Sequence, residues 1–336
     1  GQQVLVRAGV GAAPLMLALQ REILERGGWP LLRPSLEGQD ESWWSAAQDA
    51  QIDGFAPLEL AEARGADARI AISSPDNATA LSAVDPSRTA RAARARQPLR
   101  AAAEHQRWCV TVWPVPALAQ QAGIGTAAFA RLVERALFLD RPDPVTAWQA
   151  LSERQARLIE RLAPAREIRI EAPGTDLTLN VEGRTWINSD GRRNMPSGEV
   201  FTGPHEASAN GTVRFTVPTS HGGVDVAGVE LRFDDGLVVD ARAERGQDHL
   251  LQTLDTDPGA RRLGELGIGT NTGIERRTGM ILLDEKIGGT IHLAVGRSYP
   301  ETGGINESAV HWDLICDLRT GGRLLADGEA VDVLRP

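Results

Sequence analysis

Cysteine is scarce in this sequence: only Cys109 and Cys316 occur among 336 residues. Both lie inside apolar runs, RWCVTVW and DLICDL, where a thiol packs as a small hydrophobic group. Small secreted domains that depend on disulfides carry many more cysteines. We therefore expect two buried free thiols and no disulfide framework.

Long apolar runs and an excess of positive charge are also missing. No apolar stretch approaches the roughly 20 residues that span a bilayer, and no signal peptide is visible. These features predict a cytoplasmic protein that does not enter a membrane. The 45 acidic residues outnumber the 36 basic ones, which gives a net charge of -9 and a pI of about 5.3. This balance argues against binding to nucleic acid or to an anionic membrane surface.

Several familiar catalytic signatures are absent from the sequence. There is no G-x-S-x-G elbow, H-E-x-x-H helix, Walker A loop or C-x-x-C pair. The run GVGAAP at 9–14 lacks the complete G-x-G-x-x-G of a dinucleotide site, and no acidic residue convincingly follows the second strand. We interpret it as a plain turn from a strand into a helix.

The first half of the chain alternates between strand-like and helical segments. Residues 3–8, 29–33, 68–73 and 107–113 are rich in strand formers, and 12–25 has apolar residues at helical spacing. Helical patterns also cover 42–51, 57–63, 91–106 (with a break at Pro98), 126–139 and 144–163. Such alternation predicts βαβ units around a mainly parallel sheet.

The sequence pattern changes near residue 165, after which short strand-like runs and turns rich in Gly, Asp and Asn dominate. Two strands are expected around Pro173-Gly174, and a hairpin with Asp235-Gly236 at its turn. The sequence therefore predicts an α/β protein. An N-terminal α/β domain (1–165) precedes a β-rich α+β domain (166–336).

The segment 281–319 contains the most promising chemical groups. In the run TIHLAVG, strand alternation places His292 opposite to its apolar neighbours, and in AVHWDLI it places His311 and Asp313 together on one face. Two imidazoles and a carboxylate suit Zn, Fe or Mn. A lone histidine is more often a hydrogen-bonded core residue, but three such groups in one short segment favour a metal site.

Two glutamates elsewhere occupy unusual surroundings. Glu199 lies in NMPSGEVFTGP, and Glu265 lies in RRLGELGIGTN among glycines and aliphatic residues. A carboxylate in apolar sequence is costly unless it is paired or bound to metal, although each could also be a solvated loop acid. Together with the histidines and Asp313 they make five ligands, enough for two metals about 3.5–4 Å apart.

Other polar groups in this half have open interpretations. Tyr299, the only tyrosine, either donates a hydrogen bond to a developing oxyanion or packs in an interface. Lys286 binds a substrate carboxylate, anchors Glu285 or forms a surface salt bridge. The remaining histidines are less favoured as ligands: His105, His205, His221 and His249.

The motifs NMPSGEVFTGP, ELGIGTN and LDEKIGGTIHLAVG, with Tyr299 and the HWD run that ends at Asp313, resemble those of a known family. This is the thermophilic leucyl aminopeptidase family of metallopeptidases, of the aminopeptidase T and aminopeptidase S type. The resemblance covers residues 105–319 well and the first hundred residues loosely.

The resemblance implies a homodimer that removes N-terminal residues from peptides with a free N-terminus. It also implies a C-terminal domain that holds two divalent metal ions (Zn, Co, Mn or Mg). Tyr299 matches the family's active-site tyrosine, and Glu265 or Glu199, as a bridging ligand, would position the attacking water. The metal ligands implied are Glu199, Glu265, His292, His311 and Asp313.

A second interpretation is a mononuclear non-haem iron dioxygenase that opens dihydroxypyridine rings, since these enzymes resemble the family in fold and in the H-x-D run. In them a histidine occupies the position of Glu265, and the position of Glu199 is not acidic. Both glutamates therefore favour the peptidase. A non-catalytic member that only binds a ligand is least favoured, because the ligand set is complete.

Overall fold

The computed structural model describes residues 1–333 and contains two compact units, residues 1–133 and residues from 134 onward. The helix α9 (Pro144–Leu162) belongs to the second compact unit, together with the strands that follow it. The domain boundary near residue 165 stays a prediction, because a compact unit need not coincide with an independently folding domain. No helix within residues 1–333 is both long enough and apolar enough to cross a membrane.

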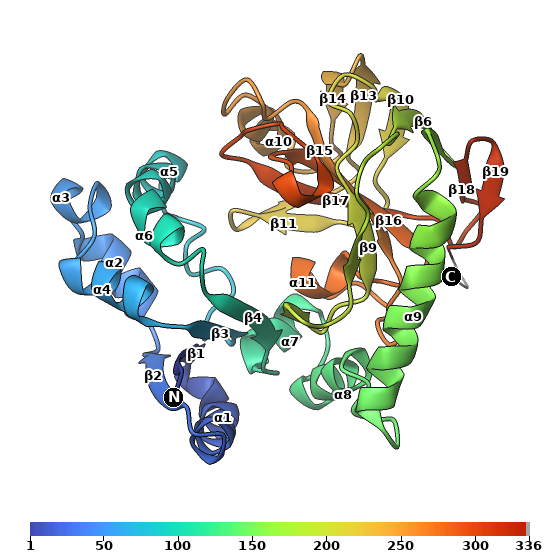
Figure 1. Ribbon diagram of the computed structural model, residues 1–336. Helices are drawn as coiled ribbons and strands as arrows, with labels where there is room; N and C mark the ends of the chain where they lie inside the picture. The colour runs from blue at the N-terminus through green and yellow to red at the C-terminus, as the bar shows by residue number, and fades with distance from the viewer. Residues whose placement is uncertain (334–336) are drawn as a thin grey trace. The chain divides into compact units, whose positions relative to one another are not determined.

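The first unit contains the predicted parallel sheet (Figure 1). Its strands run in the order β2-β1-β3-β4, and every neighbouring pair is parallel. A small core of Val6, Ala8, Met16 and Ile72 lies between the sheet and its first helix. The strands are β1 (Gln3–Gly9), β2 (Trp29–Ser35), β3 (Ala68–Ser73) and β4 (Arg107–Val112).

The helices of this unit follow the predicted segments with local differences. The helix predicted over 42–51 is two short helices, and the one over 91–106 breaks at Arg96, so that Pro98 lies in the first turn of a new helix, where its missing N–H costs nothing. The run GVGAAP forms the expected turn into a helix. The helical elements are η1 (Val10–Ala12), α1 (Ala13–Glu25), α2 (Gln39–Ala46), α3 (Asp49–Ile52), α4 (Pro57–Gly65), α5 (Pro86–Ala95), α6 (Gln97–Ala102) and α7 (Pro116–Gln121). The helix α8 (Thr126–Ala136) begins in this unit and ends just beyond residue 133.

The second unit is built on two antiparallel sheets. One has the strand order β14-β13-β10-β6-β5-β18-β19 and the other β17-β16-β15-β9-β7. The strands of the first are β5 (Glu167–Ala172), β6 (Thr175–Asn180), β10 (Asn210–Arg214), β13 (Glu230–Asp234), β14 (Leu237–Arg242), β18 (Arg323–Ala326) and β19 (Glu329–Val331). Those of the second are β7 (Ile187–Ser189), β9 (Glu199–Thr202), β15 (Leu263–Gly269), β16 (Thr290–Gly296) and β17 (His311–Asp317).

Shorter elements complete this unit, and two predicted turns are confirmed. Gly174, with φ of +75°, joins β5 to β6, and Asp235-Gly236, both with positive φ, joins β13 to β14 as the type I′ geometry requires. The shorter elements are β8 (Asn194–Met195), β11 (Thr219–His221), β12 (Val224–Val226), α10 (Gln247–Leu254), α11 (Ile281–Asp284) and η2 (Pro300–Thr302).

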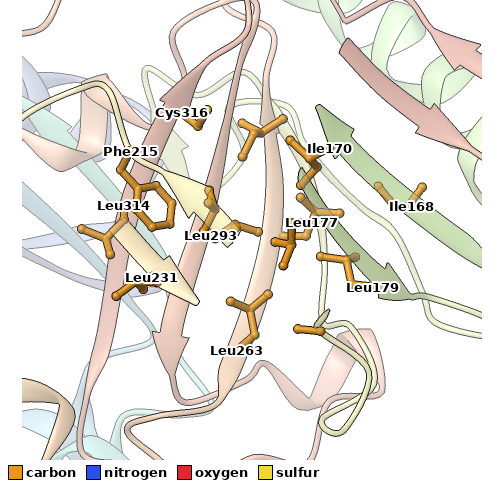
Figure 2. Packing of buried hydrophobic residues seen from close by; sticks show 14 of the residues in the cluster. Ile168, Ile170, Leu177, Leu179, Phe215, Leu231, Leu263, Leu293, Leu314 and Cys316 are labelled. Atoms are coloured by element: carbon orange, nitrogen blue, oxygen red, sulfur yellow. The ribbon is translucent and has the colours of Figure 1, made fainter. Parts of the chain in front are cut away.

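The core of the second unit lies between its two sheets. Figure 2 shows Leu293 and Leu314 on one side and Ile170 and Leu177 on the other, all pointing into the same layer. Cys316 is buried in this layer as a free thiol, whereas Cys109 is also free but only half-buried. The expectation that both thiols are buried is therefore wrong for Cys109, because this residue lies on β4, where only Val112 is fully buried.

We expect Leu177→Ala to lower the free energy of unfolding by about 2–5 kcal/mol, because it leaves a cavity between the sheets. Leu177 is fully buried. Urea unfolding measures the change, and Val239→Ala on β14, where the side chain is exposed, should cost less than about 1 kcal/mol. Equal losses for the two variants would contradict this assignment of the core.

Candidate metal centre

In the second unit, the sheet β17-β16-β15-β9-β7 is apolar on one face and carries the candidate metal ligands on the other. Leu266, Leu293 and Leu314 face the core, and the alternate positions of the same strands face away from it. The strands β9, β15, β16 and β17, which supply these positions, lie side by side (Figure 1). The polar face carries Glu199, Glu265, His292, His311 and Asp313.

The pairing of neighbouring strands places a small residue opposite each of three candidate ligands. Ala294 pairs with Glu265 on one side and with Asp313 on the other, and Gly267 pairs with His292. A Cβ atom on Gly267 would come within 2.0 Å of His292 Nε2. The imidazole of His292 therefore lies directly over the backbone of β15, in space that only glycine leaves free.

A bulge in β15 turns Glu265 towards the ligand face. The register shifts between Leu263, which pairs with Val295, and Glu265, which pairs with Ala294. Without this shift, two residues separated by one position would share a face, and Glu265 would enter the core beside Leu263. The bulge therefore separates an apolar side chain from a carboxylate only two positions away.

The five side chains form two groups that share Glu265. The ligand atoms of Glu199, Glu265 and His292 lie within 4.8 Å of one another, as do those of Glu265, His311 and Asp313. The distances to the two Glu265 oxygens are 3.3 Å from His292 Nε2 to Oε1 and 3.5 Å from His311 Nε2 to Oε2. One carboxylate thus faces both histidines.

The hydrogen bonding of this cluster fits a bound cation. His311 Nδ1 lies 2.8 Å from the carbonyl oxygen of Arg297, so this nitrogen donates its proton and Nε2 is the nitrogen that could bind a metal ion. Among residues 1–333, the buried atoms Asp313 Oδ1 and His292 Nδ1 have no hydrogen-bond partner. A set of imidazole nitrogens and carboxylate oxygens suits Zn²⁺ and similar divalent ions.

The electrostatics of the cluster also favour positive charge. Burial alone would lower the pKa of His292, but the hydrogen bond to Glu265 and the charge of Glu199 outweigh it and raise the pKa to about 10. The pKa of His311 is raised in the same way by Asp313 and Glu265 against burial. Burial raises the pKa of Glu265 itself. Without an ion, protons collect here, and a divalent cation would take their place.

Tyr299 lies beside the cluster, at the start of η2. Its hydroxyl oxygen is 3.5 Å from His311 Nε2, and its ring contacts those of His311 and Phe201. Burial, and then the charges of Glu265 and Asp313, raise the pKa of Tyr299 above its usual value. The phenol is therefore protonated at neutral pH and can donate a hydrogen bond.

Lys286 is part of this site, although its sequence neighbours suggested a surface position as well. Its side chain is fully buried, its Nζ lies 3.1 Å from Glu199 Oε1, and it forms an ion pair with Glu285. Burial alone would lower the pKa of Lys286, but these two carboxylates raise it above the usual value. The surface salt bridge is thus wrong and the contact with Glu285 is correct. One feature of the sequence could have indicated that Lys286 belongs to the site: it is the only lysine in the chain.

The other histidines lie outside both ligand groups. His221 Nδ1 is 3.0 Å from His249 Nε2, and its ring stacks on Trp312. Burial lowers the pKa of His221 to about 4, so the ring is neutral. His205 contacts Arg184 and the backbone of residue 182, and His105 contacts the carbonyl oxygen of residue 66 in the first unit.

Comparison with known proteins adds an independent finding. A model of the thermophilic metalloprotease (M29) family matches residues 1–335. Aminopeptidase 2 of Geobacillus stearothermophilus is 33% identical, over 100% of this chain and 92% of that protein. The structure of wild-type AmpT from Thermus thermophilus superposes with a TM-score of 0.82 at 27% identity, covering 98% of this chain and 94% of that chain.

A second solved structure resembles the chain in fold alone. It is the 2,5-dihydroxypyridine dioxygenase of Pseudomonas putida KT2440, with a TM-score of 0.56 at 14% identity, over 98% of this chain and 90% of that chain. At this identity the likeness extends to the architecture and not to the chemistry.

We expect Gly267→Ala to weaken the binding of Zn²⁺ roughly tenfold or more, because the new methyl group would displace the imidazole of His292. Calorimetric titration of the metal-free protein measures the affinity. Gly65→Ala, at the end of α4 with nothing within 4 Å of the added carbon, should leave it unchanged. Undiminished binding by a folded Gly267→Ala protein would exclude His292 as a ligand.

Proposed function

This chain belongs to the thermophilic metalloprotease (M29) family and is a metal-dependent aminopeptidase, and from that premise we propose that its second unit holds two divalent metal ions. The observation that carries the proposal is the position of Glu265 between two ligand groups. One group adds Glu199 and His292, and the other adds His311 and Asp313. When bound, the ions supply a water of lowered pKa and polarise the scissile carbonyl.

In this proposal Glu265 has two roles. It is a ligand in both groups, and it positions the attacking water and accepts its proton. Its two oxygens face different histidines, so each oxygen would be available to one of the two ligand groups. Its burial excludes bulk water from the reacting atoms, so that the local charges act with little screening.

Tyr299 is proposed to stabilise the tetrahedral intermediate. Its protonated hydroxyl lies next to His311, at the edge of the ligand cluster. A hydrogen bond from this hydroxyl to the oxygen that becomes negative would lower the barrier, because the donor is already in place before the reaction. The hydroxyl would make this contact more strongly in the transition state than in the bound peptide.

The substrate is proposed to be a peptide with a free N-terminus. An unprotonated α-amine has a lone pair that a divalent ion held by this cluster would accept, whereas the nitrogen of a blocked N-terminus has none to offer. A homodimer and the use of Zn, Co, Mn or Mg are further parts of the proposal. They rest on the resemblance of the sequence motifs.

We expect the metal-free protein, reconstituted in turn with Zn²⁺, Co²⁺, Mn²⁺ and Mg²⁺, to hydrolyse aminoacyl-nitroanilides. N-acetylated versions of the same compounds should be inert. Glu265→Gln should lower kcat by roughly 10²-fold or more. Absence of hydrolysis with every metal, together with one bound iron and oxygen uptake with a dihydroxypyridine, would instead support the dioxygenase.

We expect Tyr299→Phe to lower kcat by about 10²–10³-fold with little change in KM, because the lost hydrogen bond acts on the developing oxyanion. Steady-state kinetics on the best substrate measures both constants. Phe201→Leu is the matched control, since it removes a ring contact of Tyr299 and keeps its hydroxyl. If the two variants lose the same activity, packing rather than hydrogen bonding explains the effect.

A further inference from the structure

We propose that Lys286 is a positioning residue of the metal centre, which holds the carboxylate of Glu199 in the orientation that a metal ligand needs. The inference rests on the proposed function, because Glu199 is a ligand only there. Lys286 is far from Glu199 in sequence, and it reaches that residue from the turn between α11 and β16.

The two oxygens of Glu199 have different partners. Oε1 lies 3.1 Å from Lys286 Nζ, whereas Oε2 lies 3.4 Å from His292 Nε2. The ammonium therefore engages one oxygen and leaves the other facing the ligand cluster. A carboxylate without such a partner can rotate about its last bond, which would spread its oxygens over several directions.

The backbone on both sides of this contact is also fixed. The side-chain amide of Gln155 donates to the carbonyl oxygen of Glu199. The carbonyl oxygen of Lys286 accepts from the amide of Asn271 at 3.0 Å, and the amide of Lys286 donates to Leu283 at 3.1 Å. Because both main chains are held, the ion pair sets the remaining freedom of the Glu199 side chain.

Lys286 also compensates the negative charge around it. It pairs with Glu285 as well as Glu199, and the side chain of Glu285 is largely buried. Removal of the ammonium would leave two close carboxylates with no cation of the protein between them, which is strongly unfavourable in a buried site. The effect would reach the metal ligands through Glu199.

The choice of lysine at this position differs from the rest of the chain. Of the 36 basic residues, the other 35 are arginines. A lysine ends in a compact ammonium that fits between two carboxylates, whereas the guanidinium of arginine is a broad planar group. At a position with no exposed surface, that difference in shape decides which residue fits.

The test compares Lys286→Met with Glu199→Gln and the double variant in the full chain. We expect Lys286→Met to weaken Zn²⁺ binding 10–100-fold in competition with a chelator. In the Glu199→Gln background, Lys286→Met should change the Zn²⁺ affinity by less than about threefold, because the two residues act as one unit. Independent, multiplying losses would overturn the proposal, as would a lower unfolding midpoint with unchanged Zn²⁺ affinity.

Arg242→Met provides the matched control. It removes a cation from an exposed ion pair with Asp240 in the same unit and should change neither Zn²⁺ affinity nor the unfolding midpoint appreciably. A second measurement does not depend on a variant. Protein grown with lysine labelled with ¹³C at Cε should give one side-chain NMR signal, because the sequence has one lysine.

That signal should shift as Zn²⁺ is added to the metal-free protein, with the stoichiometry of binding. A signal that stays constant through saturation would overturn the proposal even if Lys286→Met failed to fold. These readouts also separate the inference from the proposed function. A metal-dependent shift in a protein without peptidase activity supports the role of Lys286 and rejects the reaction. Full peptidase activity and Zn²⁺ affinity in Lys286→Met reject the role and leave the reaction intact.

Discussion

Repulsion among buried carboxylates is the constraint on which the rest of this structure depends. Glu199, Glu265 and Asp313 lie on one face of one sheet, and Glu285 approaches from the turn before β16. Water cannot screen these charges, so each needs a positive partner or a proton. The raised pKa values of His292 and His311 and the buried ammonium of Lys286 all reflect the compensation of this negative charge.

The sandwich supplies the rigidity that such a cluster needs. Residues such as Leu293 and Leu314 anchor one face of the sheet in the core, so the opposite face keeps a fixed spacing. Ala294 and Gly267 leave room on that face for larger neighbours. The geometry of the site thus depends on the strand register, because this register places a small side chain on one strand opposite a large one on the next.

The sequence predicted the parts of the fold and site that depend on local periodicity. Alternation with a period of two correctly placed His292, His311 and Asp313 on one face, because β16 and β17 are regular. The face of Glu265 depends on a bulge, which a period of two cannot indicate. Lys286 looked ambiguous because acidic neighbours suggested solvent, and only the tertiary structure buries it. The helix expected over 42–51 failed as one unit because propensity does not mark its break.

The burial of Lys286 has a consequence for the chemistry of the whole surface. Since no other lysine exists in the chain, its exterior displays no ε-amine among the side chains of all 336 residues. Acetylation, ubiquitin attachment and carbonyl adducts at lysine side chains therefore find no accessible target in the folded state. Apart from histidine, every basic side chain of the exterior is therefore an arginine, whose guanidinium stays charged at any pH at which the protein remains folded.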